Sequence, residues 1–232
     1  MLDVDFVIQS RLKSSRLPAK AGILMPCGNN CVKATILRCE LIADTLPIKS
    51  RIFLACPEKE QKIYNKLIEG TNAKVVVGDE NNVLKRFRKI TLENNILNFV
   101  RITADNPYFC KDVIEFLLEF NDKKVNCVSL YHQKKIPNGS VVSLMSRDYL
   151  EKINKFDCKI SQEHLITSNK NEIIKLLKIP KIPEHLSWKE GRFCLDNIED
   201  YFYLHDNPKI KNLLNVKDMK THLSKRKNVE IY

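Results

Sequence analysis

The stretch Phe6–Gly22, FVIQSRLKSSRLPAKAG, begins as an apolar run and then turns basic. The run itself is typical of a buried strand. Four cations follow it, at Arg11, Lys13, Arg16 and Lys20. Parallel α/β sheets bind ligands in the loops at the carboxyl ends of their strands, and the loop after the first strand is such a place. The stretch therefore raises two questions, whether the chain is an α/β protein and whether this loop holds an anion.

The rest of the chain alternates strand and helix patterns, which predicts a largely parallel sheet with helices on both faces. The predicted strands are 4–10, 51–56, 74–78, 96–104, 125–131, 139–146, 173–180 and 192–196. The predicted helices are 33–44, 58–70, 81–94, 113–120, 147–156, 161–172, 197–207 and 216–226. Because only the short segment 180–184 resembles a hinge, we expect one domain over residues 1–232.

Composition limits the classes of function. The chain has 232 residues and a net charge of +11, but its lysines are spread along the sequence rather than gathered in a block. This favours a phosphate-bearing ligand, while a basic nucleic-acid-binding protein stays open as a weaker alternative. No apolar run approaches the ~20 residues that span a bilayer, and the N-terminal segment lacks a secretory pattern. We expect a cytoplasmic protein without membrane contact, whose eight cysteines are reduced thiols.

Two carboxylates follow apolar strand patterns, Asp105 in VRITADNP and Asp196 in RFCLD. Either could be a turn former or the N-cap of the next helix. In a site that holds polyphosphate, the same side chains could bind Mg²⁺, which prefers oxygen ligands. Two such aspartates at one sheet edge favour a shared metal more than either does alone.

Charge alone leaves the basic loop open to two interpretations. It lacks the glycines of a Walker or dinucleotide-binding loop, so a phosphate would have to be held by Arg and Lys side chains. The other interpretation is a solvated loop with no ligand.

Six segments, taken in order, resemble the cytidylyltransferases of the spore-coat-polysaccharide type, which are related to the CMP-Kdo and CMP-acylneuraminate synthetases. The segments are VIQSRLKSSRLPAK (7–20), VVVGDENNVLKRF (75–87), VRITADNP (100–107), PNGSVVSLMSRDYLEKI (137–153), QEHLIT (162–167) and RFCLDNIEDYFYL (192–204). Each is weak by itself, but six in register over most of the chain are specific.

The resemblance implies a single Rossmann-like nucleotidyltransferase domain with a mixed, mostly parallel sheet, related to glycosyltransferase type A folds. It implies transfer of CMP from CTP to a sugar, sugar acid or sugar-like phosphate, with Mg²⁺ and release of pyrophosphate, for surface polysaccharide biosynthesis. It also implies a homodimer.

The resemblance assigns roles to residues of this chain by motif position. Arg11, Arg16 and Lys20 would hold the triphosphate and act in catalysis together with Asp105. The implied metal ligands are Asp105 and Asp196. The nucleotide would also lie near Gln9, Gly78 and Arg86, and the acceptor near Asn138, Glu163, His164 and Arg192.

The chain departs from the family pattern in three respects, the first being that GNNC (28–31) lacks the Lys-Pro of the usual Gly-Lys-Pro. Ala19 and Ala104 replace glycines, which requires that neither position adopt a strained backbone conformation. Asn138, Val141 and Ser143 replace three acidic residues on the acceptor side. The altered acceptor strand implies a different acceptor or, as the alternative function, an inactive nucleotide-binding homologue that serves as a partner or sensor.

Overall fold

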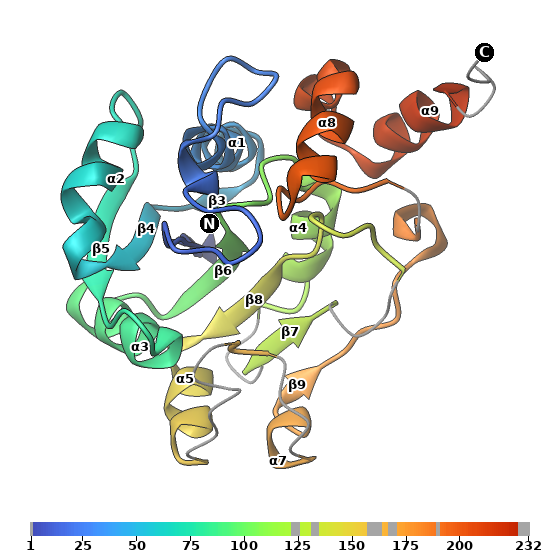
Figure 1. The fold of residues 1–232 in the computed structure, drawn as a ribbon. Coiled ribbons are helices and arrows are strands. Elements are labelled where there is room, and N and C mark those ends of the chain that lie inside the picture. The colour runs from blue at the N-terminus through green and yellow to red at the C-terminus, as the bar shows by residue number, and fades with distance from the viewer. Residues whose placement is uncertain are drawn as a thin grey trace.

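A seven-stranded sheet forms the centre of the computed structural model, which describes residues 2–121, 126–130, 135–156, 164–166, 171–188 and 191–226. Its strands are β2 (Asp5–Gln9), β4 (Ile52–Pro57), β5 (Lys74–Gly78), β6 (Asn98–Thr103), β7 (Cys127–Ser129), β8 (Ser143–Ser146) and β9 (Leu177–Lys178). The strand order is β5-β4-β2-β6-β8-β7-β9 (Figure 1). Two short strands, β1 (Leu2–Asp3) and β3 (Ile48–Lys49), pair separately in parallel.

The sheet is mixed and mostly parallel, as predicted. β5, β4, β2 and β6 run parallel, β8 is antiparallel to both β6 and β7, and β9 is parallel to β7. In the register of the central pair, Gln9 of β2 lies opposite Thr103 of β6. The loop that follows β2 and the turn that follows β6 therefore leave the same edge of the sheet side by side.

Helices cover both faces of the sheet, because side chains alternate along each strand. Phe6 and Ile8 pack into one core and Val7 into the other. The α-helices are α1 (Cys31–Thr45), α2 (Gln61–Leu67), α3 (Val83–Glu93), α4 (Lys111–Leu118), α5 (Arg147–Asn154), α7 (Asn171–Ile174), α8 (Ile198–Asp206) and α9 (Val216–Arg226). Single 3₁₀ turns occur at η1 (Lys20–Gly22), η2 (Glu58–Glu60), η4 (Glu184–Leu186) and η5 (Pro208–Asn212).

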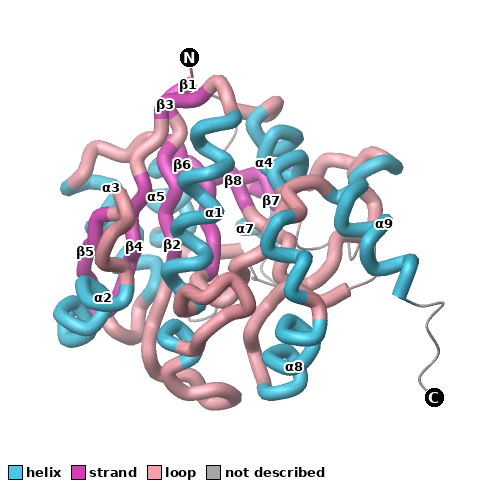
Figure 2. Tube along the Cα trace, turned by 90° about the horizontal axis from the view of Figure 1, so that it is seen from above, coloured by secondary structure: helices cyan, strands magenta, loops and turns pink. Residues whose placement is uncertain are grey.

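The helices that flank the first core are α1, α2, α4, α8 and α9, whereas α3 and α5 contribute to the second. Seen from above, α1 and α8 lie on the same side of the sheet (Figure 2). Ser146 caps α5 as predicted, since its side chain accepts a hydrogen bond from the backbone N–H of Tyr149 at 3.1 Å.

Two strand predictions were wrong. Residues 173–180 were expected to form one strand, but Ile173 and Ile174 end α7 and only Leu177–Lys178 pair in the sheet. Residues 192–196 were expected to form another. Instead, Phe193 donates its N–H to the carbonyl of Asn138 and Leu195 donates to that of Asp105, both at 2.8 Å. The segment changes partner after two residues and so forms only an isolated bridge, Asn138 with Arg192.

Three further predictions concern the cysteines, membrane-spanning helices and the segment around residues 158–172. The cysteines within the described ranges are all free thiols. In the same part of the chain, no helix combines the length and the hydropathy needed to cross a bilayer. The predicted helix 161–172 and Cys158 fall mostly or wholly outside the described residues.

The loop after β2 contains a strained position that the sequence did not predict. Ala19 has φ +55° and ψ +22°, the left-handed conformation in which glycine is favoured, so the expectation of unstrained backbone was wrong at this position. Its N–H donates to the carbonyl of Leu12 at 2.9 Å and closes the loop on itself. Ala104, the other alanine that replaces a glycine, does not have a positive φ.

We expect Ala19→Gly to raise the free energy of unfolding by about 0.5–1 kcal/mol, because relief of left-handed strain exceeds the entropy that glycine adds to the unfolded chain. Ala104→Gly should lower it by about 0.5–1 kcal/mol, since no strain is relieved there. Urea denaturation of both variants measures the difference. An equal loss of unfolding free energy in Ala19→Gly and Ala104→Gly would contradict a strained backbone at Ala19.

Candidate active site

A polar pocket of about 220 Å³ opens at the carboxyl ends of β2 and β6. Most of its wall comes from the loop after β2, and the end of β6 supplies much of the rest. Of the predicted site residues, it brings together Gln9, Arg11, Arg16, Lys20, Asp105, His164 and Asp196. The pocket is thus where a parallel sheet binds its ligand, and it joins segments that are far apart in sequence.

Lys20 lies at the centre of the pocket. Its ammonium donates to Asp105 Oδ2 and, at 2.9 Å, to Asp196 Oδ1. All three side chains are largely buried, with exposed fractions of 14% for Lys20, 22% for Asp105 and 15% for Asp196. One cation therefore bridges the two strand-end carboxylates that the sequence singled out.

This arrangement determines the protonation states. Burial alone would lower the pKa of Lys20, but the charges and hydrogen bonds of Asp105 and Asp196 raise it above its ordinary value. Burial alone would raise the pKa of Asp196, but its hydrogen bond and charge interaction with Lys20, helped by Arg16 and Arg192, lower it. At neutral pH Lys20 is a cation and Asp196 a carboxylate.

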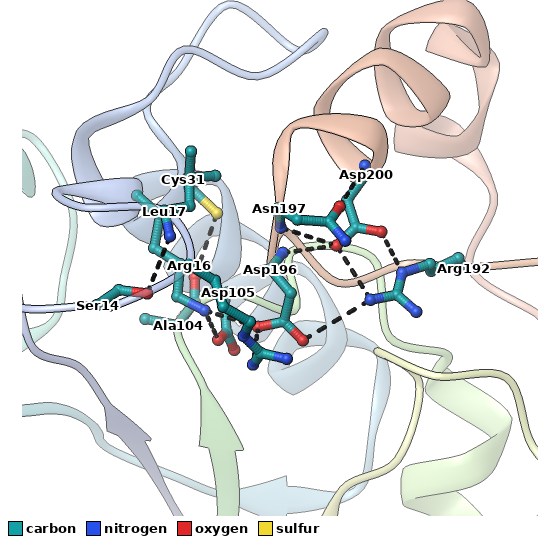
Figure 3. A network of polar contacts seen from close by, with 11 residues as sticks. Ser14, Arg16, Leu17, Cys31, Ala104, Asp105, Arg192, Asp196, Asn197 and Asp200 are labelled. Atoms are coloured by element: carbon teal, nitrogen blue, oxygen red, sulfur yellow. Dashed lines mark hydrogen bonds and ion pairs between the residues drawn. The ribbon is translucent and has the colours of Figure 1, made fainter.

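The start of α8 holds Asp196 in place. Asn197, not Asp196, is the N-cap, because its side chain accepts from the N–H of Asp200 in a capping box. Asp200 is 2% exposed; its Oδ2 accepts from the N–H of Asp196 at 2.7 Å, and its carboxylate also accepts from Arg192. The carboxylate of Asp196 is left to face Arg16, at 2.9 Å (Figure 3). It also accepts from Lys20, at 2.9 Å. Asp105 caps no helix either, since the N-cap of α4 is Cys110.

Gln9 is oriented by a residue that the sequence did not single out. Arg101 Nε and one of its terminal nitrogens donate to Gln9 Oε1, at 3.1 and 2.7 Å. The amide nitrogen of Gln9 is thereby left as the group able to donate elsewhere. Arg101 follows Val100 in the VRITADNP segment, and its position within an apolar strand pattern was the signal available.

The cations of the loop differ in what they contact. The side chain of Arg16 is 65% exposed and bonds Asp196, whereas Arg11 is exposed and lines the pocket. Lys13 also lines the pocket, but its ammonium pairs with Glu80 at 3.1 Å. Lys13 is also not among the residues to which the resemblance assigns a role.

Gly78 and Arg86 lie outside the pocket wall. Arg86 is 1% exposed and donates from a terminal nitrogen to the carbonyl of Ser10 at 3.1 Å. A Cβ on Gly78 would lie 2.8 Å from Arg86 Cγ, so Gly78 allows α3 to pack closely on β5. Arg86 thus supports the loop, and Gly78 makes room for the helix that carries Arg86.

The predicted acceptor-side residues are only partly assembled. His164 is exposed and lines the pocket, whereas Arg192 is paired with Asp200. Asn138 contributes its backbone to the bridge with Arg192. Ser143 is buried in β8 and Val141 packs against the first core. Glu163 lies outside the described residues.

Two groupings of acidic side chains bear on metal binding. Cys194, Asp196 and Asp200 have ligand atoms within 4.8 Å of one another. However, Asp200 already accepts hydrogen bonds from Arg192 and two backbone N–H groups, and burial raises the pKa of the Cys194 thiol to about 12. The pair Asp105 and Asp196 fits a hard cation better, since no hydrogen bond from the described residues reaches Asp105 Oδ1.

Comparison with known proteins places this geometry in context. No family model matches the chain. An uncharacterized protein of Methanocaldococcus jannaschii is 27% identical over 212 residues, covering 90% of this chain and 85% of that protein. The spore coat polysaccharide biosynthesis protein SpsF of Bacillus subtilis is 24% identical over 205 residues, covering 87% and 84%.

Solved structures share the fold. A cytidylyltransferase from Leptospira borgpetersenii superposes with a TM-score of 0.83 at 18% identity, and each chain is covered over 100% of its length. A CMP:2-keto-3-deoxy-manno-octonic acid synthetase complexed with CTP superposes with a TM-score of 0.55 at 14% identity, covering 91% of this chain and 98% of that one. The fold is the Rossmann-like nucleotidyltransferase fold, and the resemblance to the cytidylyltransferases is confirmed.

We expect Lys20→Met to lower the free energy of unfolding at pH 7.5 by about 1–3 kcal/mol, because it leaves two partly buried carboxylates without their shared cation. At pH values above the pKa of a free aspartate, the lowered pKa of Asp196 stabilises the folded wild type. This contribution is lost as the pH falls through the lowered pKa of the folded state. The difference between variant and wild type should therefore be smaller at pH 3, below the pKa of a free aspartate, than at pH 7.5 in urea denaturation.

Lys13→Met is the matched control, since it removes an ammonium from the same loop. The side chain of Lys13 is 75% exposed. We expect a loss below about 0.5 kcal/mol at both pH values. A loss of stability from Lys20→Met that is the same at pH 3 and pH 7.5 would contradict the bridged arrangement.

Proposed function

From the confirmed resemblance to the cytidylyltransferases, we propose that this protein transfers CMP from CTP to a sugar, sugar acid or sugar-like phosphate and releases pyrophosphate. The observation that carries the proposal is the meeting of Arg11, Arg16 and Lys20 with Asp105 and Asp196 in one pocket at the carboxyl edge of the sheet. Such a site offers cations for a triphosphate and carboxylates for a divalent metal.

The three cations would bind the triphosphate and neutralise the charge that develops on the leaving pyrophosphate. Lys20 is suited to this role because its ammonium is charged and because hydrogen bonds to Asp105 and Asp196 hold it in the pocket. Arg16 contacts Asp196 while most of its side chain is exposed, so its guanidinium is accessible to a phosphate that binds in the pocket. Arg11 lines the same pocket.

Asp105 and Asp196 would hold Mg²⁺, which supplies neutralisation of charge on the phosphate oxygens when it is bound. Two features of this chain support the assignment. The low pKa of Asp196 keeps it ionised at neutral pH, and Asp105 Oδ1 receives no hydrogen bond from the described residues. Asp105 would then serve both the metal and Lys20.

The acceptor would bind on the side of the pocket that His164 lines, with Arg192, Asn138 and Glu163 as further candidates. The name of the Bacillus subtilis relative supports a role in polysaccharide biosynthesis. The substitutions at Asn138, Val141 and Ser143 favour an acceptor that differs from that of other cytidylyltransferases. The cytoplasmic location and the homodimer stay predictions.

Incubation with CTP, Mg²⁺ and a panel of sugars, sugar acids and sugar phosphates tests the proposal, with pyrophosphate release and mass spectrometry of the product as measurements. We expect a CMP adduct of one acceptor class. Lys20→Ala and Asp105→Ala should each lower turnover at least about 100-fold, because each removes a charge aimed at the reacting phosphates. Lys13→Ala should stay within about threefold of wild type, since its ammonium pairs with Glu80.

Full turnover by Asp105→Ala would show that the metal assignment is wrong. Tight CTP binding without a product from any acceptor would support the inactive homologue instead. Equal losses from Lys20→Ala and Lys13→Ala would indicate a general charge effect rather than a specific clamp.

A further inference from the structure

Three polar side chains lie buried beneath the basic loop, and neither the comparisons nor the sequence motifs account for them together. Glu60 ends η2, Tyr64 belongs to α2 and Arg86 to α3. Their exposed fractions are 5%, 0% and 1%. Buried polar groups of this size are rare unless a partner satisfies them, so their partners are informative.

All three are directed at the residues on either side of Arg11. Glu60 Oε2 accepts a hydrogen bond from the N–H of Leu12 at 2.9 Å. Arg86 donates to the carbonyl of Ser10 at 3.1 Å, and the Tyr64 hydroxyl lies 2.6 Å from Ser10 Oγ. The backbone is therefore held on both sides of Arg11, while Arg11 itself is exposed and lines the pocket.

Stability alone does not explain this cluster. Well-packed apolar side chains are often at least as stable as buried charges, and here Arg86 Nε has no hydrogen-bond partner. Burial lowers the pKa of Arg86, with partial compensation from Cys56 and Glu60, but a guanidinium stays charged at neutral pH. The chain thus retains two buried polar side chains, Glu60 and Arg86, whose hydrogen bonds within the described residues go to the loop that carries Arg11.

We propose that Glu60, Tyr64 and Arg86 are positioning residues, which fix the backbone from Ser10 to Leu12 so that the guanidinium of Arg11 is presented to the triphosphate. This rests on the proposed function. The three residues do not touch the nucleotide and act through Arg11. A side chain on a short loop without glycines has many orientations, and fixing its backbone reduces the entropy lost when phosphate binds.

The first test is independent of catalysis. Trypsin cuts after Arg11, Lys13 and Arg16 only when the loop opens, so the nicking rate reports the open population. Glu60→Ala should raise nicking at these bonds about tenfold, because the N–H of Leu12 loses a charged acceptor. Glu58→Ala removes an exposed carboxylate from the same 3₁₀ turn and should leave the rate unchanged. Glu60→Gln keeps an acceptor oxygen and should stay within about threefold of wild type.

The second test is a double-mutant cycle measured as kcat/KM for CTP. Glu60→Ala should lower kcat/KM about 10- to 100-fold in the wild-type background. In the Arg11→Ala background the same change should have less than about a twofold effect, because the group that it positions is already gone. A merely structural role for Glu60 would produce the same loss in both backgrounds.

Several outcomes would overturn the inference. They are unchanged nicking in Glu60→Ala, equal nicking in Glu58→Ala and Glu60→Ala, a rise in nicking from Glu60→Gln as large as that from Glu60→Ala, or an additive double-mutant cycle. If the wild type transfers no CMP to any acceptor, the proposed function fails, and the nicking rates still decide whether Glu60 holds the loop.

Discussion

The sharing of the Lys20 ammonium between Asp105 and Asp196 is the interaction on which the site depends. Two largely buried carboxylates that face each other repel, and their charged forms are stable only with a cation between them. Lys20 supplies that cation from the loop after β2, where η1 begins. One ammonium thereby holds together the end of β6, the segment before α8 and the basic loop.

Backbone hydrogen bonds bring these segments within reach of Lys20. The N–H of Ala104 donates to the carbonyl of Gln9 at 2.9 Å, which continues the pairing of β2 and β6 past their ends. The N–H of Leu195 donates to the carbonyl of Asp105 at 2.8 Å, which sets the segment of Asp196 beside that of Asp105. The carboxylates are thus placed by main-chain geometry, and the left-handed Ala19 directly precedes Lys20, which bridges them.

The parts of the fold that could be predicted are those with strong local patterns. The runs that became β4, β5 and β6 are mostly apolar, and the intervening helix α3 shows an apolar face. Residues 192–196 look like a strand, but their two partners lie on different segments, and no local pattern encodes a change of partner. The sequence left Asp196 open as N-cap or metal ligand, because Asp196 and Asn197 are both good caps; in the structure Asn197 caps α8, and Lys20 and Arg16 contact the carboxylate of Asp196.

By itself, the sequence determined the class of fold, the basic loop and the two strand-end aspartates, since apolar periodicity and residue type are local properties of the chain. Tertiary structure alone decided which groups meet. It assigned one cation to two carboxylates, placed Arg101 on Gln9, and buried Arg86 with Glu60 and Tyr64 beneath the loop. These contacts join residues separated by 48 to 176 positions. The physical reason is that a hydrogen bond or ion pair depends on distances of a few ångströms, which the packing of strands and helices fixes and which sequence spacing does not encode.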